Sequence, residues 1–347
     1  MNTGSEQLGI GVIGLGIIGR QHVARLTDPR TSTRLAGVFD TDEALVEEFS
    51  QAHSVPGVNS VADLLALEDM DAVVIAVPSG LHRDLTIAAL EAGKHVLLEK
   101  PIEVSVAASD EVLQAARASG KVLSVVSQRR FAPANQYIKQ LLETGGLGRI
   151  TSAAIEVPLW RTQEYYDSAG WRGTWAMDGG GALMNQGVHL VDLALWLLGD
   201  VEEVYAHTGL LAHERIEVED TVTITARLKS GAFMTFLATT AAHSPPQIRV
   251  NIMGDRGTIV TVKEEITHFH TIDGPQEAEV ELPELEDGVT ENEYIQRRQL
   301  DDFVAAVRNG TPALITPEQA RNAVAFIEAV YESGRTGQPV RPAPLPQ

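Results

Sequence analysis

The chain of 347 residues contains no cysteine. Disulfide bonds, thiolate metal sites and cysteine nucleophiles are therefore excluded, and a cytoplasmic location is the expectation. Apolar residues make up 44% of the chain, but no uninterrupted apolar run approaches the roughly 20 residues that a membrane span needs. The first residues show no basic segment and no leader-like apolar stretch, so we expect no secretion signal and no membrane partner.

Basic residues are scarce relative to acidic ones. The chain has 27 Lys and Arg against 47 Asp and Glu, which gives a formal net charge of −20. Nucleic acids bind to basic surfaces, so this balance argues against a nucleic-acid partner. Eight acidic residues fall between Glu277 and Glu293, a stretch without Lys or Arg. We expect a solvated loop or strand edge there, because no metal-ligand spacing is evident.

The first third of the chain alternates apolar strands with helices. We expect strands at Leu8 to Ile13, Arg34 to Asp40, Ala72 to Val77, Val96 to Glu99 and Val122 to Val126. We expect helices at Ile17 to Leu26, Glu43 to Ala52, Ala62 to Leu67, Leu81 to Ala92 and Ser105 to Ser119. Continuous apolar strands interleaved with helices indicate a parallel sheet buried on both faces. We therefore predict an α/β Rossmann domain with a doubly wound parallel sheet over residues 1–126.

Strands dominate the rest of the chain. We expect them at Ile150 to Val157, Glu203 to Leu211, Thr221 to Leu228, Phe233 to Ala241, Arg249 to Met253 and Thr258 to Val262. We expect helices at Asn135 to Glu143, at Ile295 to Val307 and from Pro317 to Gly334. Residues 127–347 are thus predicted to form an α+β domain with an open, largely antiparallel sheet. Apolar and polar residues alternate after Thr221, which indicates one free sheet face, so we expect a homodimer or homotetramer built on it.

A glycine-rich loop, Gly14-Leu15-Gly16-Ile17-Ile18-Gly19, joins the first strand to the first helix. This pattern is typical of a dinucleotide site, in which helix N–H groups, here at Ile17 and Ile18, face the pyrophosphate. Asp40 ends the second strand 21 residues after Gly19, where a carboxylate can accept from the adenosine ribose hydroxyls. No arginine follows it to hold a 2′-phosphate, so NAD is favoured over NADP. A plain turn with a surface aspartate is the alternative.

A lysine follows the fourth strand. Lys100 precedes a proline, and the residue before a proline is held extended, so the amine is fixed at the carboxyl end of that strand. The carboxyl ends of such strands form the rim along which a dinucleotide lies. We therefore expect cofactor contacts from Val77, Pro78, His82, Glu99, Lys100, Pro101 and Gln128. For His82, simple capping or packing is the alternative.

A second cluster begins with three glycines at 179–181 and enters an apolar helix. Asn185 and His189 are four residues apart, which predicts that both project from one helical face. Asp192, three residues further on, is placed to orient the histidine. No second ligand stands at convincing spacing, so we expect no metal site. A packed core histidine is the alternative.

The motifs GLGIIG, EKP and GGGALMNQGVH, in this order and spacing, resemble the Gfo/Idh/MocA (glucose–fructose oxidoreductase/inositol dehydrogenase) family over essentially the whole chain. The resemblance implies a Rossmann domain plus an open-sheet domain, with the active site between them. It also implies that Lys100 and His189 are the catalytic pair and that the Lys100–Pro101 peptide bond is cis. Many members carry aspartate where this chain has Asn185. An amide cannot exchange a proton, so Asn185 is expected to position the substrate hydroxyl.

The implied chemistry agrees with the residue types. Histidine titrates near neutrality, so His189 is the expected general base. Lys100, beside a cationic nicotinamide, should have a lowered pKa and hydrogen-bond the reacting oxygen. Arginines and aromatic rings suit anionic groups and sugar rings, so substrate contacts are expected from Arg129, Trp171 and Arg172. Arg172 is the preferred contact for an anionic group.

The leading hypothesis is an NAD-dependent oxidoreductase that transfers hydride between nicotinamide and a secondary alcohol of a sugar, sugar derivative or cyclic polyol. The asparagine form is similar to the branch of the family that oxidises C3 of sugars, including nucleotide-linked N-acetylsugars. Two alternatives stay open. One is an NAD-dependent glycoside hydrolase that acts by oxidation and elimination, and the other is a cofactor-binding regulatory protein without turnover. The intact Lys100 and His189 argue against the second.

Overall fold

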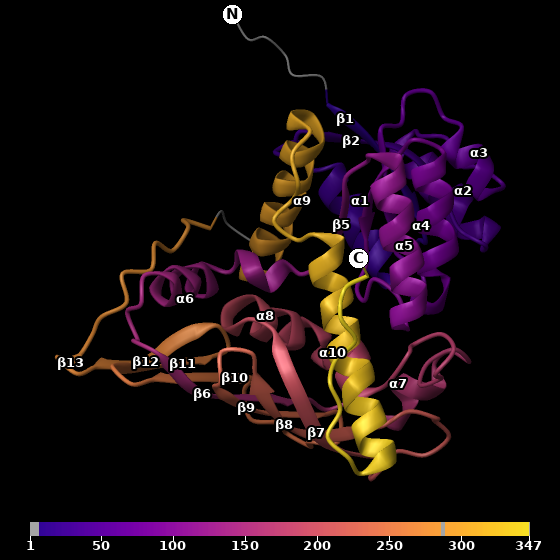
Figure 1. The fold of residues 1–347 in the computed structure, drawn as a ribbon. Helices are drawn as coiled ribbons and strands as arrows, with labels where there is room; N and C mark the ends of the chain where they lie inside the picture. Colours follow the sequence, from indigo (N-terminus) through magenta and orange to yellow (C-terminus); the bar gives the residue numbers. More distant parts are fainter. Residues whose placement is uncertain (1–6, 286–288, 347) are drawn as a thin grey trace, which may run out of the picture. The chain divides into compact units, whose positions relative to one another are not determined.

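The computed structural model describes residues 7–285 and 289–346. The described chain divides into two compact units, whose helices and strands are labelled in Figure 1. Unit 1 comprises the residues up to Glu103, Ala107–Val126 and Gln296–Arg321, and unit 2 comprises Val104–Val106, Ser127–Ile295 and the residues from Asn322 on. Residues 1–6, for which no secretion signal is expected, and residues 286–288 of the acidic stretch lie outside the described residues.

Unit 1 contains a parallel sheet of five strands in the order β2-β1-β3-β4-β5. The strands are β1 (Leu8–Ile13), β2 (Thr33–Phe39), β3 (Ala72–Ile75), β4 (His95–Leu98) and β5 (Leu123–Val125). Every residue of β1 and β3 is buried, as the continuous apolar character of these strands predicts. From β1 the chain runs to β2 on one side and later to β3 on the other. This switch point is where a doubly wound sheet binds its ligand, and the predicted fold of this part is confirmed.

The helices of unit 1 lie close to their predicted bounds. They are α1 (Ile17–Leu26), α2 (Glu43–His53), α3 (Val61–Leu65), α4 (His82–Glu91), α5 (Val106–Ser119) and α9 (Glu291–Asn309), of which α5 and α9 begin in unit 2. A short 3₁₀ turn, Ser79–Leu81, precedes α4. The predicted start of α9, at Ile295, is too late. The Thr290 N–H donates to Glu293 Oε2 at 2.8 Å and the Glu293 N–H donates to Thr290 Oγ1 at 3.2 Å, and this reciprocal cap starts the helix earlier.

Unit 2 contains a sheet of eight strands in the order β13-β12-β11-β10-β6-β9-β8-β7. The strands are β6 (Ile150–Pro158), β7 (Val201–Gly209), β8 (Thr221–Leu228), β9 (Phe233–Thr239), β10 (Arg249–Gly254), β11 (Gly257–Val262), β12 (Glu265–Thr271) and β13 (Gly274–Pro275). Among the described strands of this sheet, only β6 and β9 pair in parallel, so the predicted, largely antiparallel sheet is confirmed. The sequence did not predict β12, because its hairpin turns on Lys263 and Glu264, with φ of 51° and 68°, rather than on a glycine or asparagine.

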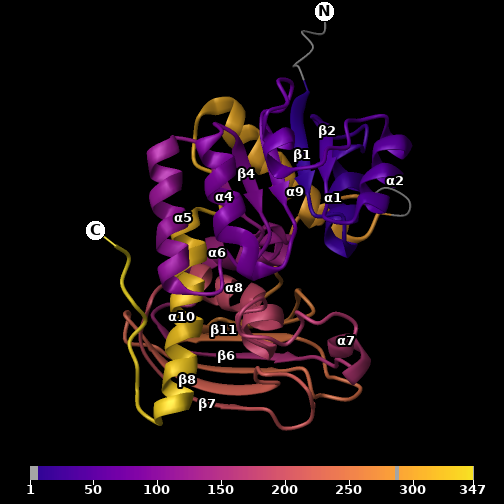
Figure 2. The ribbon, with the colours of Figure 1, turned by 90° about the vertical axis from the view of Figure 1, so that its right-hand side faces the viewer.

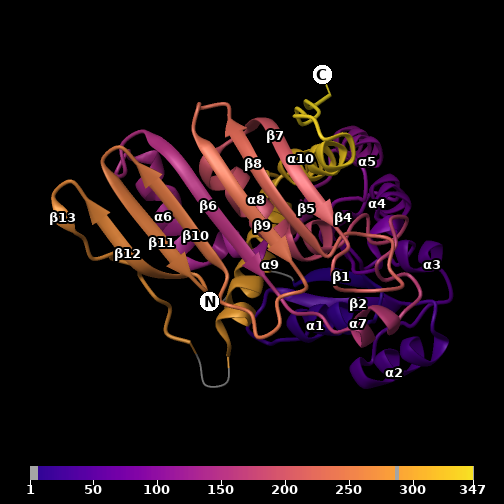
Figure 3. The same cartoon turned by 90° about the horizontal axis from the view of Figure 1, so that it is seen from below.

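One face of this sheet is covered and the other is open. A π-helix (Ala182–Gly187) and α8 (Val188–Leu198) lie over one face, as Figure 2 shows for α8. Figure 3 shows the opposite face of the strands, over which no helix of the described chain is drawn. Residues of β8 alternate accordingly between buried and exposed positions. The predicted free face is therefore present.

The remaining helices of unit 2 are α6 (Pro133–Glu143), α7 (Gln163–Asp167) and most of α10 (Pro317–Thr336). A capping box formed by Thr316 and Gln319 begins α10. The Gln319 N–H donates to Thr316 Oγ1 at 3.4 Å, and the Thr316 N–H donates to Gln319 Oε1 at 3.3 Å. The sequence did not predict α7.

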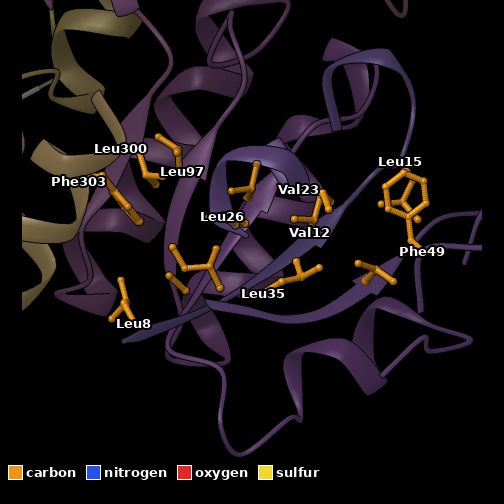
Figure 4. Close-up of a cluster of buried hydrophobic side chains, with 14 of the residues drawn as sticks. Leu8, Val12, Leu15, Val23, Leu26, Leu35, Phe49, Leu97, Leu300 and Phe303 are labelled. Atoms are coloured by element: carbon orange, nitrogen blue, oxygen red, sulfur yellow. The ribbon is translucent and has the colours of Figure 1, made fainter. Parts of the chain in front are cut away.

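The hydrophobic core of unit 1 includes a segment from late in the chain. Figure 4 shows Leu300 and Phe303 of α9 beside Leu97, and all three are buried in one cluster with Leu8 and Leu26. Burial of this apolar face is the reason that Gln296–Arg321 belongs to unit 1. The predicted domains, residues 1–126 and 127–347, placed that segment in the second domain, and the structure differs there. For the rest of the chain the predicted division remains a proposal.

No helix in the described part of the chain is both long and apolar enough to cross a membrane. Among residues 7–285 and 289–346, no group of three or more metal-ligating side chains gathers. Of the acidic stretch, the described residues up to Leu285 form an irregular segment, and Glu291 and Glu293 lie in the first turn of α9.

Candidate active site

The glycine loop after β1 combines two close approaches with one open position. Gly14 has a φ of 93°, and a Cβ there would overlap the Ala76 carbonyl oxygen. A Cβ at Gly19 would overlap the Gly14 carbonyl oxygen. At Gly16, by contrast, a Cβ would meet no atom within 4 Å. The first and third glycines thus allow tight packing, and the second borders the open space that a pyrophosphate requires.

The beginning of α1 is also open. No side chain of the described residues caps the helix at Gly16, and Ile17 and Ile18 are 72% and 42% exposed. The Asp40 carboxylate is fixed beside the loop, because it accepts from the Leu15 N–H at 2.6 Å. A carboxylate has about four acceptor positions, so Asp40 keeps the capacity to bind ribose hydroxyls. These residues fit a dinucleotide, with the positive end of the helix dipole facing its phosphates.

His82 differs from its predicted role as a cofactor contact. Its side chain is fully buried, and its two ring nitrogens lie 2.7 Å from the Pro101 carbonyl oxygen and 3.1 Å from that of Val77. Burial lowers the pKa of the imidazole. His82 therefore joins the loop after β3 to the loop after β4. Val77 and Pro78 are half-buried at the rim, and their cofactor contacts remain predictions.

Lys100 follows β4 and forms a cis peptide bond with Pro101, as the resemblance implied. The preceding Glu99 turns into unit 1, where its carboxylate lies 2.8 Å from His22 Nε2. Arg25 lies 3.0 Å from His22 Nδ1, and a guanidinium only donates, so His22 carries its proton on Nε2 and donates it to Glu99. Glu99 is thus anchored to α1 by its side chain, and this anchor fixes the backbone that presents Lys100.

The three glycines before the second cluster allow close packing rather than phosphate binding. A Cβ at Gly180 would overlap the Tyr331 hydroxyl, and a Cβ at Gly181 would overlap the Glu219 carbonyl oxygen. Burial raises the pKa of Tyr331, and the neighbouring Glu219 raises it further. The glycine run therefore lets α10 and the start of β8 approach the beginning of the π-helix.

Glu219 caps that π-helix from a distant part of the sequence. Its carboxylate, in a residue only 5% exposed, accepts from the N–H groups of Gly181 at 2.9 Å and Leu183 at 2.8 Å. It also accepts from the Tyr331 hydroxyl at 3.1 Å. Burial raises the pKa of Glu219, and these hydrogen bonds oppose the rise. The sequence analysis missed this residue, whose only local signal is that it lies two residues before β8.

Asn185 lies within the π-helix, and its amide is oriented by a buried carboxylate. Its Nδ2 donates to Asp178 Oδ1 at 2.9 Å, and Asp178 Oδ2 accepts from the Gly173 N–H at 2.6 Å. The predicted common face of Asn185 and His189 assumed one continuous α-helix. The π-helix ends at Gly187 and α8 begins at Val188, so the two residues lie on different kinds of helix and their common face stays a prediction.

Asp192 differs from its predicted role of orienting His189. Its two carboxylate oxygens accept from Arg130 at 2.8 and 2.6 Å, and both side chains are buried. Asp192 therefore fixes Arg130, which also lies 5.6 Å from the centre of the Trp196 ring. This buried pair joins the first residues of unit 2 to the middle of α8.

Two other predicted residues lie beside Arg130. Arg129 Nη1 donates to Glu264 at 2.6 Å, so its charge is already balanced, and its substrate contact stays a prediction. Gln128 Oε1 is buried and has no hydrogen-bond donor within the described residues. The Gln128 amide thus keeps an acceptor for a bound molecule, as the prediction of a cofactor contact requires.

Aromatic and arginine side chains gather on the segment before the π-helix. Arg172 lies 4.6 Å from the Trp171 ring and 4.5 Å from the Tyr165 ring. Tyr166 follows Tyr165 in the sequence and is buried, with its hydroxyl 2.9 Å from Thr240 Oγ1. Burial raises the pKa of Tyr166 to about 12. Tyr166 is a packing residue, whereas Trp171 and Arg172 are half-buried.

Comparison with known proteins now identifies the family. Residues 8–127 match the oxidoreductase family with an NAD-binding Rossmann fold, GFO_IDH_MocA, and residues 135–260 match the GFO/IDH/MocA C-terminal domain. The chain belongs to the Gfo/Idh/MocA family. This family member is therefore an oxidoreductase with an NAD-binding Rossmann domain, as the sequence predicted.

Three relatives illustrate the similarity. The crystal structure of the WlbA dehydrogenase from Bordetella pertussis, in complex with NADH and UDP-GlcNAcA, is 30% identical with a TM-score of 0.87, and covers 98% of this chain and 100% of that one. Inositol 2-dehydrogenase 2 from Saccharopolyspora erythraea is 28% identical over 98% of this chain and 97% of its own. Inositol 2-dehydrogenase from Rhodococcus erythropolis is 40% identical over 42% of each chain.

Proposed function

We propose that this family member is an NAD-dependent dehydrogenase of a secondary alcohol in a sugar, sugar derivative or cyclic polyol. The observation that carries the proposal is the position of Lys100 at the carboxyl end of β4. Because β1, β3 and β4 are neighbours in one parallel sheet, the glycine loop and Lys100 emerge at the same edge. The relatives named inositol 2-dehydrogenase, and the WlbA dehydrogenase with its nucleotide sugar, support this class of substrate.

The proposed cofactor contacts lie on the glycine loop and at the carboxyl ends of the strands. NAD, when bound, supplies the group that accepts or donates hydride. We assign its pyrophosphate to the N–H groups of Gly14–Gly19 and its adenosine ribose to Asp40. We assign the remaining contacts to Val77, Pro78, Glu99, Lys100, Pro101 and Gln128. The Asp40 carboxylate would repel a 2′-phosphate, so we propose that NAD is preferred over NADP.

The proton chemistry is assigned to three side chains. In the oxidation direction, His189 takes the hydroxyl proton as the carbon–hydrogen electron pair leaves as hydride and the carbonyl forms. Lys100 donates a hydrogen bond to the same oxygen and stabilises the charge that develops there. Asn185, oriented by Asp178, positions the hydroxyl without exchanging a proton.

The open sheet face is proposed as the contact between copies of this chain in a homodimer or homotetramer. It exposes Phe233 at 61% and Tyr205 at 37%, together with the outward residues of β8. A broad sheet face with exposed aromatic residues is a usual site for such contacts.

The experiment is to measure NADH formation over inositols, free sugars, glycosides and nucleotide sugars. Lys100→Met should lower kcat about 10²- to 10⁴-fold while NAD affinity stays within several-fold, since the amine serves the reacting oxygen. His189→Ala should lower kcat similarly and remove the pH dependence of kcat near neutrality. Lys229→Met is the matched control, because Lys229 is an exposed surface residue paired with Asp200.

Other results of these measurements would favour one of the two alternative functions or contradict the role of a named residue. Consumption of a glycoside without net NADH would favour the glycoside hydrolase. NAD binding without turnover of any substrate would favour the regulatory protein. Near wild-type kcat in Lys100→Met would contradict the catalytic role of the lysine, and an unchanged pH profile in His189→Ala would place the base elsewhere.

A further inference from the structure

Two arginines in unit 2 share one aromatic ring. The guanidinium carbons of Arg161 and Arg172 lie 4.9 and 4.5 Å from the centre of the Tyr165 ring, and Arg172 lies 4.6 Å from that of Trp171. All four side chains belong to half-buried residues. Stacking on a ring holds a guanidinium in place while its N–H donors point outward from the ring stack. We call Arg161 and Arg172 the arginine pair.

No carboxylate of residues 7–285 and 289–346 balances the arginine pair. Within the described residues, neither guanidinium has an ion-pair partner, whereas Arg129 and Arg130 are paired with Glu264 and Asp192. This is unusual in a chain whose acidic residues outnumber its basic ones by 47 to 27. Two cations held close together repel each other, so their joint placement favours a bound anion.

The arginine pair also has unused hydrogen-bond donors. The Nε atoms of both arginines are buried and have no hydrogen-bond partner among the described residues. Buried donors are usually satisfied, and an unsatisfied one suggests that a ligand completes the site. Nε together with an Nη is the edge of the guanidinium that binds a carboxylate or phosphate with two parallel hydrogen bonds.

The arginine pair is linked directly to the residue that positions the substrate hydroxyl. Arg161 Nη2 donates to Gln186 Oε1 at 2.9 Å. The amide of Gln186 donates in turn to the Tyr165 hydroxyl at 3.3 Å and lies 3.5 Å from Asn185 Oδ1. Gln186 therefore bridges the arginine pair to Asn185, and one substrate can contact both.

We propose that the substrate carries an anionic group, a carboxylate or a phosphate, which the arginine pair binds while Asn185 positions the reacting hydroxyl. This inference rests on the proposed dehydrogenase function and narrows its substrate to acidic sugars or sugar phosphates. Tyr165 is the platform that holds both guanidinium groups, and Gln186 fixes the direction of Arg161. Neutral inositols and hexoses are then poor substrates of this chain.

The experiment compares substrates that differ in one added anionic group. NADH formation is measured with a free hexose, its uronic acid and its 6-phosphate, and with a nucleotide-linked hexose and the matching nucleotide-linked uronic acid. The uronic acid and phosphate arms distinguish the two sources of the anion. We expect kcat/KM to be at least about 10-fold higher for one compound that carries the added carboxylate or phosphate than for the matching compound that lacks it, the effect of one or two charge-assisted hydrogen bonds.

The variants Arg161→Gln and Arg172→Gln test the assignment. Each should lower kcat/KM for the preferred acidic substrate about 10- to 100-fold, mainly through KM, and leave the value for the matching compound without the added carboxylate or phosphate within about 3-fold. Affinity for NADH should be unchanged in both. Arg149→Gln is the matched control, because it removes the same charge from a side chain that is 80% exposed.

Equal effects of Arg161→Gln and Arg172→Gln on anionic and neutral substrates, or no effect on either, would overturn the inference while leaving the dehydrogenase function intact. If no compound gives NADH, the proposed function fails. The anion site is then tested by calorimetric titration of the NADH-loaded protein with the same sugars. Binding of the uronic acid or phosphate that is lost in both arginine variants would support the anion site. Binding that does not distinguish charge would refute it.

Discussion

Glu219 allows a quantitative prediction about the helix that carries Asn185. Its carboxylate accepts two backbone N–H groups, from Gly181 and Leu183, and the Tyr331 hydroxyl. Glu219→Gln keeps the size of the side chain but replaces one acceptor oxygen with an NH₂ group. One of the two backbone donors then faces another donor instead of an acceptor.

The size of the effect follows from the number of donors left unsatisfied. One buried unsatisfied donor costs about 1–3 kcal/mol, so Glu219→Gln should lower the free energy of unfolding of unit 2 by that amount. Glu219→Ala removes both acceptors for the backbone donors and should cost about 2–6 kcal/mol. Because the beginning of the π-helix is held less firmly, we also expect KM for the substrate to rise in both variants.

The difference in stability between wild type and Glu219→Gln should depend on pH in a definite direction. Burial raises the pKa of Glu219 above its ordinary value of 4.5, so the folded protein holds this proton more tightly than the unfolded chain. The stabilising contribution of the protonated carboxyl is complete below 4.5 and is lost as the pH rises through the raised pKa. Glu219→Gln has no such titration. Its deficit in stability relative to wild type should therefore be largest in acid and shrink towards alkaline pH.

The assay is urea unfolding from pH 4.5 upward. It is followed by the fluorescence of Trp175, whose ring lies 5.1 Å from that of Tyr331. The matched control is Glu217→Gln on the same segment, whose exposed side chain accepts from the Trp175 N–H at 3.0 Å. Equal stability of Glu219→Gln and wild type at every pH would refute the argument, as would a deficit that grows as the pH rises.

Two further predictions concern the cofactor and the substrate. Asp40→Ala should raise the Kd for NAD about 10-fold and lower that for NADP, measured by titration, and wild type binding both equally would contradict the role of Asp40. Asp178→Asn should raise KM for the sugar about 10-fold by releasing the Asn185 amide, while the pH profile of kcat and the Kd for NAD stay unchanged. An unchanged KM would show that Asp178 does not position Asn185.

The first part of the fold was predictable because its signals are local. The buried strands are continuously apolar, and Gly14 to Gly19 stand in the expected order after β1. The family was predictable from its motifs, and the resemblance to that family implied the cis bond at Pro101. These features depend on residues that are neighbours in sequence.

The errors arise where distant residues decide the structure. α9 belongs to unit 1 because Phe303 is buried beside Leu97, a contact that no local pattern reveals. His82 looked like a rim residue, but its ring is enclosed by the Val77 and Pro101 carbonyl groups. Asp192 looked like a partner of His189, but Arg130 occupies both its carboxylate oxygens.

The substrate side of the site is organised by buried carboxylates that do not touch the substrate in the proposed mechanism. Asp178 orients Asn185, Glu219 holds the beginning of the π-helix, and Asp192 holds Arg130 against α8. Each accepts from fixed donors, so each is satisfied inside the protein. The arginine pair at 161 and 172 is the exception, since its charge has no such partner among the described residues. In a site where the other buried charges are balanced, the unbalanced pair is the one that a ligand can complete, and its sign requires that ligand to be an anion.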